Sequence, residues 1–400
     1  MSFAFNFDIP ADELDDEFDL PTKLDALDIS QQPTASGSGS VVPHKEVPLS
    51  ELLETLPPLL SYTPITVPLS STTQPSRHAT FLRRDLFDAR FQVLNQDDDE
   101  VEVAPPAAAD VKGKQKEHFI DEQTDLIKGV YEGGLKTWEC SLDLVDCLDE
   151  RRFAGEEELN SPRVRGKSVL EVGCGTAVPS CAVFARLLNE IRKAPTATDA
   201  ARPKKTRLHL QDYNKQVLTL ITLPNLLLTY AQHLASPSSA PDADEDPEPA
   251  SHDAGELDVT PEFLEAFEAL LERENVELRF FEGDWSGMDQ AVRGEGEGEG
   301  GYDLVLTSET VYSVPSLEPL LNLLESACDR AGATDDDALC LVACKRIYFG
   351  VGGGELEFRR RVEERGGEVE AVWGEGEGKG KNSGVGRTVM SVKWRGKEKV

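Results

Sequence analysis

A chain of 400 residues is longer than one typical domain, and its 39% of hydrophobic residues can supply a core for only part of that length. The formal net charge of −33 argues against nonspecific binding to nucleic acid or to anionic membranes, because both would repel the protein. Seven scattered cysteines without a close C-x-x-C pair indicate reduced, buried thiols, and they indicate neither a disulfide framework nor a metal site.

The chain start, MSFAFNFDIPADELDDEF, has no basic stretch followed by an apolar one, so no secretory signal is predicted. No apolar run approaches the length that spans a bilayer. We therefore expect an intracellular protein of the cytoplasm and nucleus with no membrane partner. The basic stretch ARPKKTR (201–207) could serve as a nuclear-import patch, but the sequence favours an exposed basic loop.

Residues 1–115 are expected to be mostly disordered, with short ordered pieces. Pro, Ser and Thr are abundant in 28–80, and an acidic run, QDDDEVE, follows at 96–102. Such a composition cannot bury enough apolar surface to offset the entropy of the chain. Parts of 46–94 contain enough Leu and Phe to form the ordered pieces.

From 116 to 396, apolar strands alternate with amphipathic helices. We predict strands at 168–172, 207–214, 276–285, 302–312, 339–346 and 387–394, and helices at 178–191, 217–234, 316–329 and 354–365. This alternation predicts an α/β fold: a parallel, doubly wound sheet with helices on both faces. The acidic insert 237–258 and the Glu-Gly stretches 294–301 and 374–381 are predicted to be solvated loops.

The turn SVLEVGCGTAVPS (168–180) places Gly173 and Gly175 directly after the first of these strands. A dinucleotide site needs a third glycine, which is missing here, and no Walker phosphate loop is present. The remaining pattern, E-x-G-x-G with an acid ending the next strand, suits a ligand with a ribose diol and a charged amino-acid end but no pyrophosphate. S-adenosylmethionine is such a ligand.

Polar residues follow four of the predicted strands, at 173–176, 212–214, 283–285 and 307–312. In an open α/β sheet the ligand sits at the carboxyl ends of the strands. We therefore expect these four segments to surround one site.

Several stretches resemble a known family. LEVGCGT is similar to the first motif of class I, seven-strand methyltransferases. Further stretches narrow the resemblance: GVYEGGLKTWECSLDL (129–144), LQDYNKQVLTLITLPN (210–225), FEGDW (281–285), LTSETVY (306–312) and KRIYFGVGGG (345–354). Together they resemble the eukaryotic protein-histidine N-methyltransferases that modify a histidine of a large-subunit ribosomal protein, L-three. The resemblance covers roughly 118–394, with gaps at the inserts.

This resemblance implies a Rossmann-like, seven-strand methyltransferase domain that binds S-adenosylmethionine, methylates the tele nitrogen of histidine and acts as a monomer. Asp212 is expected to accept both ribose hydroxyls, or to be an ordinary strand-end turn residue. Asp284 and Trp285 are expected at the adenine, and Trp138 is expected in a cofactor lid or in the core. The cofactor-binding set is Thr137, Trp138, Glu139, Cys140, Ser141, Gly173, Gly175, Gln211, Asp212, Tyr213, Gly283, Asp284, Trp285 and Ser308.

The same resemblance implies Glu309 and Tyr348 as the catalytic pair. Glu309 would orient the acceptor imidazole or receive its proton, while Tyr312, Tyr348 and Phe349 would wall its pocket. Gly350 and the glycines at 352–354 would pass close to the substrate. Glu171 would anchor the glycine turn or face the methionine ammonium through water.

The acidic surface suits a basic ribosomal protein as partner. Two other readings stay open: a related protein-lysine methyltransferase, and a non-catalytic acidic chaperone of a ribosomal protein.

Overall fold

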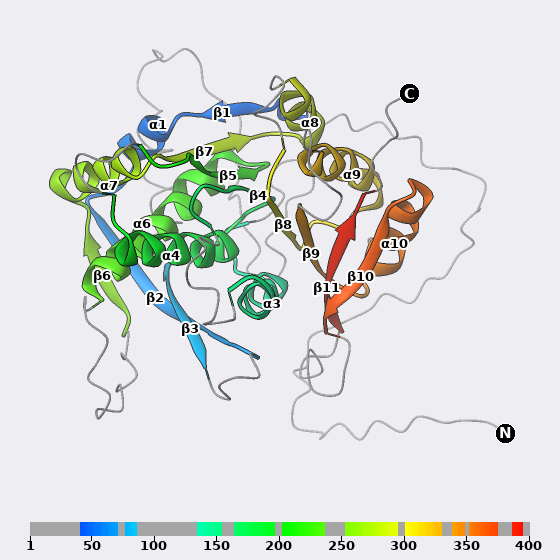
Figure 1. Cartoon of the computed structure of the whole chain (residues 1–400), viewed down its shortest axis with the longest axis horizontal. Helices are drawn as coiled ribbons and strands as arrows, with labels where there is room; N and C mark the ends of the chain where they lie inside the picture. Colours follow the sequence, from blue (N-terminus) through cyan, green and yellow to red (C-terminus); the bar gives the residue numbers. More distant parts are fainter. Residues whose placement is uncertain are drawn as a thin grey trace, which may run out of the picture. The chain divides into compact units, whose positions relative to one another are not determined.

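The main sheet of the protein is mixed, with a parallel centre and antiparallel edges. In the computed structural model, which describes residues 41–70, 77–85, 134–153, 164–196, 202–236, 253–294, 301–329, 338–348, 352–374 and 386–394, it has eight strands. Their spatial order is β1 (Lys45–Val47), β7 (Val276–Glu282), β5 (Thr206–Asp212), β4 (Ser168–Val172), β8 (Leu304–Ser308), β9 (Leu339–Lys345), β11 (Arg387–Lys393) and β10 (Glu368–Trp373) (Figure 1).

The five strands from β7 to β9 are parallel neighbours, as the alternation of strands and helices predicts. β11 runs antiparallel to both β9 and β10, and β1 runs antiparallel to β7. The predicted parallel arrangement therefore holds at the centre of the sheet, and the strands at its two edges run antiparallel. All six predicted strands are present, and β10 and β1 are additional.

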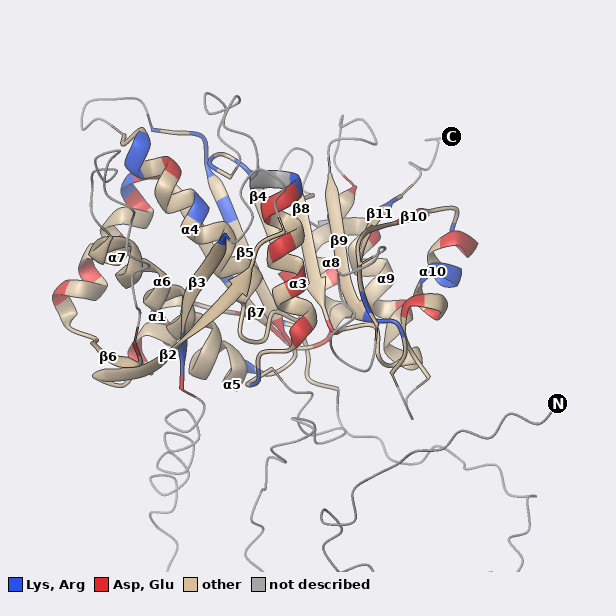
Figure 2. Cartoon of the chain, turned by 90° about the horizontal axis from the view of Figure 1, so that it is seen from below, with Lys and Arg blue, Asp and Glu red and all other residues tan. Residues whose placement is uncertain are grey.

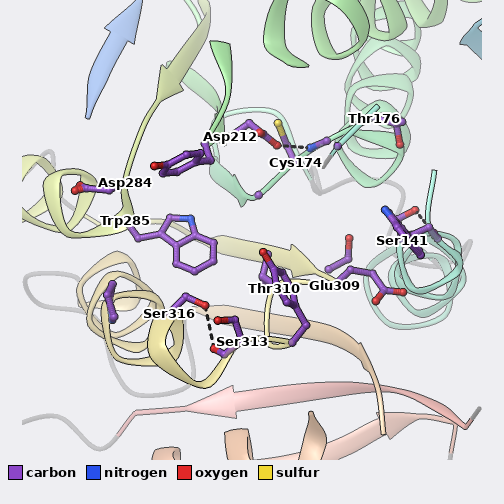
Figure 3. Close-up of a pocket in the computed structure, with 18 of the residues that line it drawn as sticks. Ser141, Cys174, Thr176, Asp212, Asp284, Trp285, Glu309, Thr310, Ser313 and Ser316 are labelled. Carbon is purple, nitrogen blue, oxygen red and sulfur yellow. Dashed lines mark hydrogen bonds between the residues drawn. The ribbon is translucent and has the colours of Figure 1, made fainter. Parts of the chain in front are cut away.

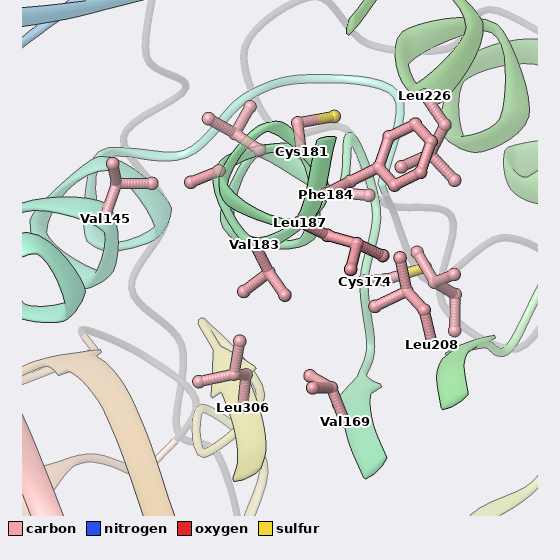
Figure 4. Packing of buried hydrophobic residues seen from close by; sticks show 14 of the residues in the cluster. Val145, Val169, Cys174, Cys181, Val183, Phe184, Leu187, Leu208, Leu226 and Leu306 are labelled. Atoms are coloured by element: carbon pink, nitrogen blue, oxygen red, sulfur yellow. The ribbon is translucent and has the colours of Figure 1, made fainter. Parts of the chain in front are cut away.

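Helices cover both faces of this sheet. On one face lie α3 (Glu139–Leu148), α4 (Val178–Lys193), α6 (Leu223–Ala235) and α7 (Pro261–Arg273); on the other lie α8 (Trp285–Gly294), α9 (Val314–Cys328) and α10 (Glu355–Glu364). Along β4 the side chains alternate between the two layers: Val169 packs into the first, and Leu170 and Val172 into the second. Figure 4 shows Val183 and Leu187 of α4 above Val169 and Leu306. The doubly wound arrangement is confirmed.

The helical stretch Lys215–Ala235 is apolar nearly all round. It comprises α5 (Lys215–Val217), a π-helical turn (Leu218–Thr222) and α6. By length and composition alone it could cross a membrane, which corrects the expectation that no apolar run approaches that length. However, 72% of its apolar window is buried in the molecule, which is what a core helix requires.

The N-terminal region contributes ordered elements. Besides β1, these are α1 (Leu49–Glu54), β2 (Leu59–Pro68) and β3 (His78–Arg84). A second, antiparallel sheet has the order β3–β2–β6, in which β6 is Gly255–Asp258. Residues 1–40 and 86–115, which were predicted to be disordered, lie outside the described residues. So do most residues of the two Glu-Gly loops.

The prediction of a solvated loop over 237–258 was wrong at its end. Residues 255–258 form β6, and Leu257 lies opposite Leu60 of β2. The local composition does not predict a strand here, but β2 supplies the backbone hydrogen bonds that hold β6 in the sheet. Each of the seven cysteines is a free thiol, and all but Cys328 are buried, as the spacing predicts.

Candidate functional site

A cavity of about 470 Å³ opens at the carboxyl ends of β4, β5, β7 and β8. The four polar segments expected to meet do surround it. Its wall is formed by Val41, Gly134, Lys136, Trp138, Ser141, Gly173, Cys174, Gly175, Thr176, Asp212, Tyr213, Asp284, Trp285, Ser286, Ser308, Glu309, Thr310, Tyr312, Ser313, Ser316 and Pro319. Figure 3 shows Asp284 and Glu309 well apart, with Trp285 and Thr310 between them.

The glycine turn after β4 requires glycine at both positions. Gly173 and Gly175 have φ angles of +62° and +50°, where other residues are strained. A Cβ at Gly173 would lie 2.6 Å from Cγ2 of Thr310, and one at Gly175 would lie 3.2 Å from the carbonyl oxygen of Gly134. The turn therefore brings bare backbone to the cavity.

Asp212 holds this turn in place from the end of β5. Its Oδ2 accepts a hydrogen bond from the Gly175 nitrogen at 2.9 Å, and its Oδ1 accepts one from the Asn214 nitrogen at 3.1 Å. A carboxylate has about four acceptor positions, so the side chain can still accept hydroxyl groups from a ligand. Asp212 is thus both a turn residue and a wall residue, and its ribose contact stays a prediction.

Gln211 lies behind the wall, which corrects the expectation that it flanks the ligand. Successive side chains of a strand point to opposite faces, so Gln211 points away from the side that Asp212 takes. Its Oε1 accepts from the Gly173 nitrogen at 3.1 Å and from Nε1 of Trp285 at 2.9 Å, and its Nε2 donates to the Gly283 carbonyl at 2.8 Å. One buried amide therefore positions three residues around the cavity.

The N-terminal segment completes the end of the cavity near Asp284. The Asp284 nitrogen donates to the Val42 carbonyl at 3.0 Å, and the Val42 nitrogen donates to the Tyr213 hydroxyl at 3.1 Å. Asp284 also accepts from the Gly287 nitrogen at 2.8 Å, at the start of α8. Composition gave no signal for this contact, because Val42 and Tyr213 are 171 positions apart.

Glu309 forms the other end of the cavity, in the loop after β8. Its φ of +58° is unusual for a residue with a side chain, and such conformations gather at functional sites. The Tyr348 hydroxyl donates to Glu309 Oε2 at 2.6 Å and accepts from the Lys345 nitrogen at 3.1 Å. Burial, and then the Glu309 carboxylate, raise the pKa of Tyr348 far above its usual range, so this hydroxyl stays a donor.

The other oxygen, Oε1 of Glu309, is buried and accepts no hydrogen bond from any residue that the structure describes. Its nearest charged neighbour is Lys345, whose Nζ lies 3.6 Å away. That ammonium also lies 3.5 Å from Oε2 of Glu139 and 4.7 Å from the centre of the Trp138 ring. Sequence reasoning missed Lys345, although it lies within the KRIYFGVGGG stretch.

Three of the predicted residues around Trp138 do not reach the cavity. The Thr137 hydroxyl bonds to the Thr176 hydroxyl at 3.2 Å behind the wall. Cys140 is buried; that burial, and then the Glu309 carboxylate, raise the pKa of its thiol well above the ordinary value. Glu139 faces Lys345 instead. Ser141 does line the cavity, one helical turn after Trp138.

The glycines at 352–354 approach backbone rather than an open site. The Gly353 nitrogen donates to the Tyr312 carbonyl at 3.1 Å, and a Cβ at Gly353 would lie 2.2 Å from that oxygen. Tyr312 itself lines the cavity, and its ring centre is 6.3 Å from that of Tyr348. Phe349 and Gly350 lie outside the described residues.

Of the predicted site residues, ten line the cavity: Trp138, Ser141, Gly173, Gly175, Asp212, Tyr213, Asp284, Trp285, Ser308 and Glu309. The other six do not line it: Thr137, Glu139, Cys140, Gln211, Gly283 and Tyr348. Glu171 is also outside the wall, because it is fully buried. Its Oε2 accepts a hydrogen bond from the Ser180 nitrogen in α4 at 2.9 Å and another from the Ser180 hydroxyl. It anchors the turn and does not face the cavity.

No protein-family model matches the chain. The chain is 31% identical over 347 residues to histidine protein methyltransferase 1 of Schizosaccharomyces pombe, a match that covers 87% of this chain and 84% of that protein. It is 32% identical over 288 residues to the protein of the same name from Saccharomyces cerevisiae, with coverage of 71% and 69%. A homolog of that name from Bos taurus is 32% identical over 62% of this chain and 52% of its own length.

Among solved structures, a putative SAM-dependent methyltransferase from Streptococcus mutans has a TM-score of 0.33 at 12% identity, covering 66% of this chain and 51% of that one. The ribosomal protein L11 methylase from Lactobacillus delbrueckii has a TM-score of 0.30 at 8% identity, covering 65% and 81%. Scores this low do not establish a shared fold, so the fold is assigned from the strand order and the family from the sequence relatives.

Proposed function

The chain belongs to the histidine protein methyltransferase 1 family, and from this premise we propose that it methylates the tele nitrogen of a histidine in a large-subunit ribosomal protein, L-three. Its reaction is S-adenosylmethionine-dependent N-methylation of protein histidine. The observation that carries the proposal is the position of Glu309, a carboxylate with one buried oxygen that accepts no hydrogen bond from the described residues, at one end of the cavity.

The cavity fits the cofactor. A volume of about 470 Å³ is within the usual range for sites of ligands of this size. Gly173 and Gly175 would pass under the amino-acid end, Asp212 would accept the ribose hydroxyls, and Asp284 and Trp285 would hold the adenine. When bound, S-adenosylmethionine supplies a methyl group on sulfur, whose transfer to nitrogen breaks the carbon–sulfur bond and leaves S-adenosylhomocysteine.

The protein's own contribution is to choose the nitrogen. A neutral imidazole has one N–H and one lone pair, and near neutral pH most of the free ring is in this form. Glu309 Oε1 would accept the N–H of the pros nitrogen, which leaves the lone pair on the tele nitrogen. After transfer the ring is cationic, and its extra proton can leave through the same hydrogen bond toward Glu309 and then to water. Tyr348 holds the carboxylate by its second oxygen.

The ribosomal substrate is supported by charge. Ribosomal proteins are strongly basic, and this chain has a net charge of −33. We propose that a monomer meets the protein in the cytoplasm or the nucleus, before or during its assembly.

A labelling experiment tests the proposal. The enzyme and tritiated S-adenosylmethionine are incubated with lysate from cells that lack the enzyme, and the labelled protein is isolated, hydrolysed and mapped. We expect tele-methylhistidine in one large-subunit ribosomal protein. Methyllysine would contradict the acceptor, pros-methylhistidine would contradict the role of Glu309, and label in a non-ribosomal protein would contradict the substrate.

A further inference from the structure

The ammonium of Lys345 occupies a site that is built for a cation. Two carboxylates, Glu309 and Glu139, lie 3.6 and 3.5 Å from its Nζ, and the Trp138 ring lies 4.7 Å below it. Carboxylates and an indole face are the groups that bind ammonium ions in proteins. The Lys345 side chain is only 21% exposed, so this cation is held inside the fold.

We propose that Lys345 is a positioning residue that makes the acceptor site accept a neutral imidazole and reject a cationic side chain. This inference rests on the proposed function, since it concerns the same imidazole that Glu309 would hold. Lys345 fills the cation site with the protein's own charge, and it also fixes Glu309 on the side opposite to Tyr348.

The chemistry requires such a device. An unbalanced carboxylate next to the acceptor would stabilise imidazolium, whose tele nitrogen has no lone pair and cannot take a methyl group. The ammonium of Lys345 offsets that effect. Glu309 can then order the neutral ring by a hydrogen bond without raising the pKa of the acceptor.

Other charged or titratable groups face this pair from each neighbouring element, and Lys136, in the segment before α3, lies over the same Trp138 ring with its Nζ 4.9 Å from the ring centre. From α3 come Glu139, Cys140 and Asp143; from β9 and the loop after it come Cys344 and Tyr348; and from β11 comes Arg387. Arg387 is paired with Asp143, its Nε lying 2.5 Å from Oδ2. The thiols and the phenol have raised pKa values, mainly because they are buried, so they stay neutral near pH 7. Lys345 is therefore the described cation within ion-pairing distance of Glu309.

The test is the pH dependence of kcat for Lys345→Met, with the mapped ribosomal protein as acceptor. In this variant the bound imidazole has a carboxylate and no compensating ammonium, so its pKa rises. We expect the acid limb of the kcat profile to move up by about one pH unit, which lowers kcat about tenfold on that limb and leaves it nearly unchanged on the alkaline side. A peptide with lysine in place of the acceptor histidine should inhibit this variant more strongly than the wild type.

Three further variants separate this role from a structural one. Lys345→Arg keeps the charge and should restore the wild-type acid limb. Arg346→Met is the matched control, because Arg346 is the adjacent cation but pairs with Glu355 away from the cavity. The double variant Glu309→Gln/Lys345→Met removes both charges, so its acid limb should not move up as it does in Lys345→Met.

The outcomes are distinct. A wild type that labels no histidine removes the proposed function and this inference with it. If the wild type labels histidine but the acid limb of Lys345→Met does not move, the inference alone is overturned. The same holds if Lys345→Met loses activity equally at every pH.

Discussion

Glu171 shows how burial makes one carboxyl group a source of pH-dependent stability. It is fully buried below the glycine turn, and this burial raises its pKa from 4.5 to about 8 against the opposing hydrogen bonds from Ser180. The folded chain therefore keeps a proton that the unfolded chain releases above its ordinary pKa. The stability that this provides is fully present below about pH 4.5 and is lost as the pH rises through about 8.

The isosteric change Glu171→Gln should remove this dependence. We expect the free energy of unfolding of the variant, relative to the wild type, to increase from about pH 5 to about pH 8 by on the order of 3 kcal/mol or more. Urea unfolding at both pH values measures it. Glu268→Gln, on the exposed side of α7, is the control. A difference that stays constant with pH would show that Glu171 is ionised in the fold.

The position of Asp212 requires a carboxylate, because each of its two oxygens accepts a hydrogen bond from a backbone nitrogen. The amide of Asp212→Asn has only one oxygen, so either Gly175 or Asn214 would face an N–H group. We expect the affinity for S-adenosylmethionine to fall by about five- to 150-fold, since an unsatisfied polar group costs about 1–3 kcal/mol. Calorimetry measures the affinity, and Asp149→Asn, which pairs with Arg77 away from the cavity, is the control. Equal affinity in Asp212→Asn would remove Asp212 from the binding site.

At the scale of elements, β1 links a remote segment to the cofactor end of the cavity. Gly283 has a φ of +96°, and a Cβ there would lie 2.3 Å from the Pro43 carbonyl oxygen. The change Gly283→Ala should displace residues 41–47 and weaken S-adenosylmethionine binding several-fold, with faster hydrogen exchange in β1 as a second sign.

Gly366→Ala is a matched control for this change. Gly366 has a φ of +81°, so an alanine is strained there too, but no atom lies within 4 Å of its added Cβ. A difference between the two variants therefore reports the contact with the N-terminal segment and not the backbone strain. If both variants bind the cofactor equally well, the segment 41–47 does not contribute to cofactor affinity.

Elements with a strong local pattern could be predicted from the sequence, and those that depend on a distant partner could not. β4 was placed at its observed residues because SVLEV is apolar and is followed by glycine. β6 and β1 carry several acids or lysines in short stretches, and they form only because β2 and β7 offer them a free edge. In the site, the residues on strand ends were found, whereas Val41 and Lys345 reach the cavity or its border through tertiary packing alone.

At the scale of the whole molecule, charge is the property that should govern the encounter with the substrate. Acidic residues lie in a row along α3, where Asp143 pairs with Arg387 and Glu139 with Lys345, and α10 also carries both signs in pairs (Figure 2). Glu357 in α10, for example, is paired with Arg360 and Arg361. Pairs of this kind contribute little net field, so the attraction for a basic partner comes from the excess of 74 acids over 41 Lys and Arg in the full chain.

This attraction predicts a specific dependence on salt. Long-range steering raises the rate of association and is screened within about 8 Å at physiological ionic strength. For the proposed ribosomal substrate, kcat/KM should therefore fall about tenfold or more between low and moderate NaCl, while kcat changes little, because the aligned complex does not rely on distant charges. Initial rates at several salt concentrations measure both quantities. The affinity for S-adenosylmethionine, measured by calorimetry over the same range, is the control, and kcat/KM that does not change with salt would show that the acidity serves solubility and not recognition.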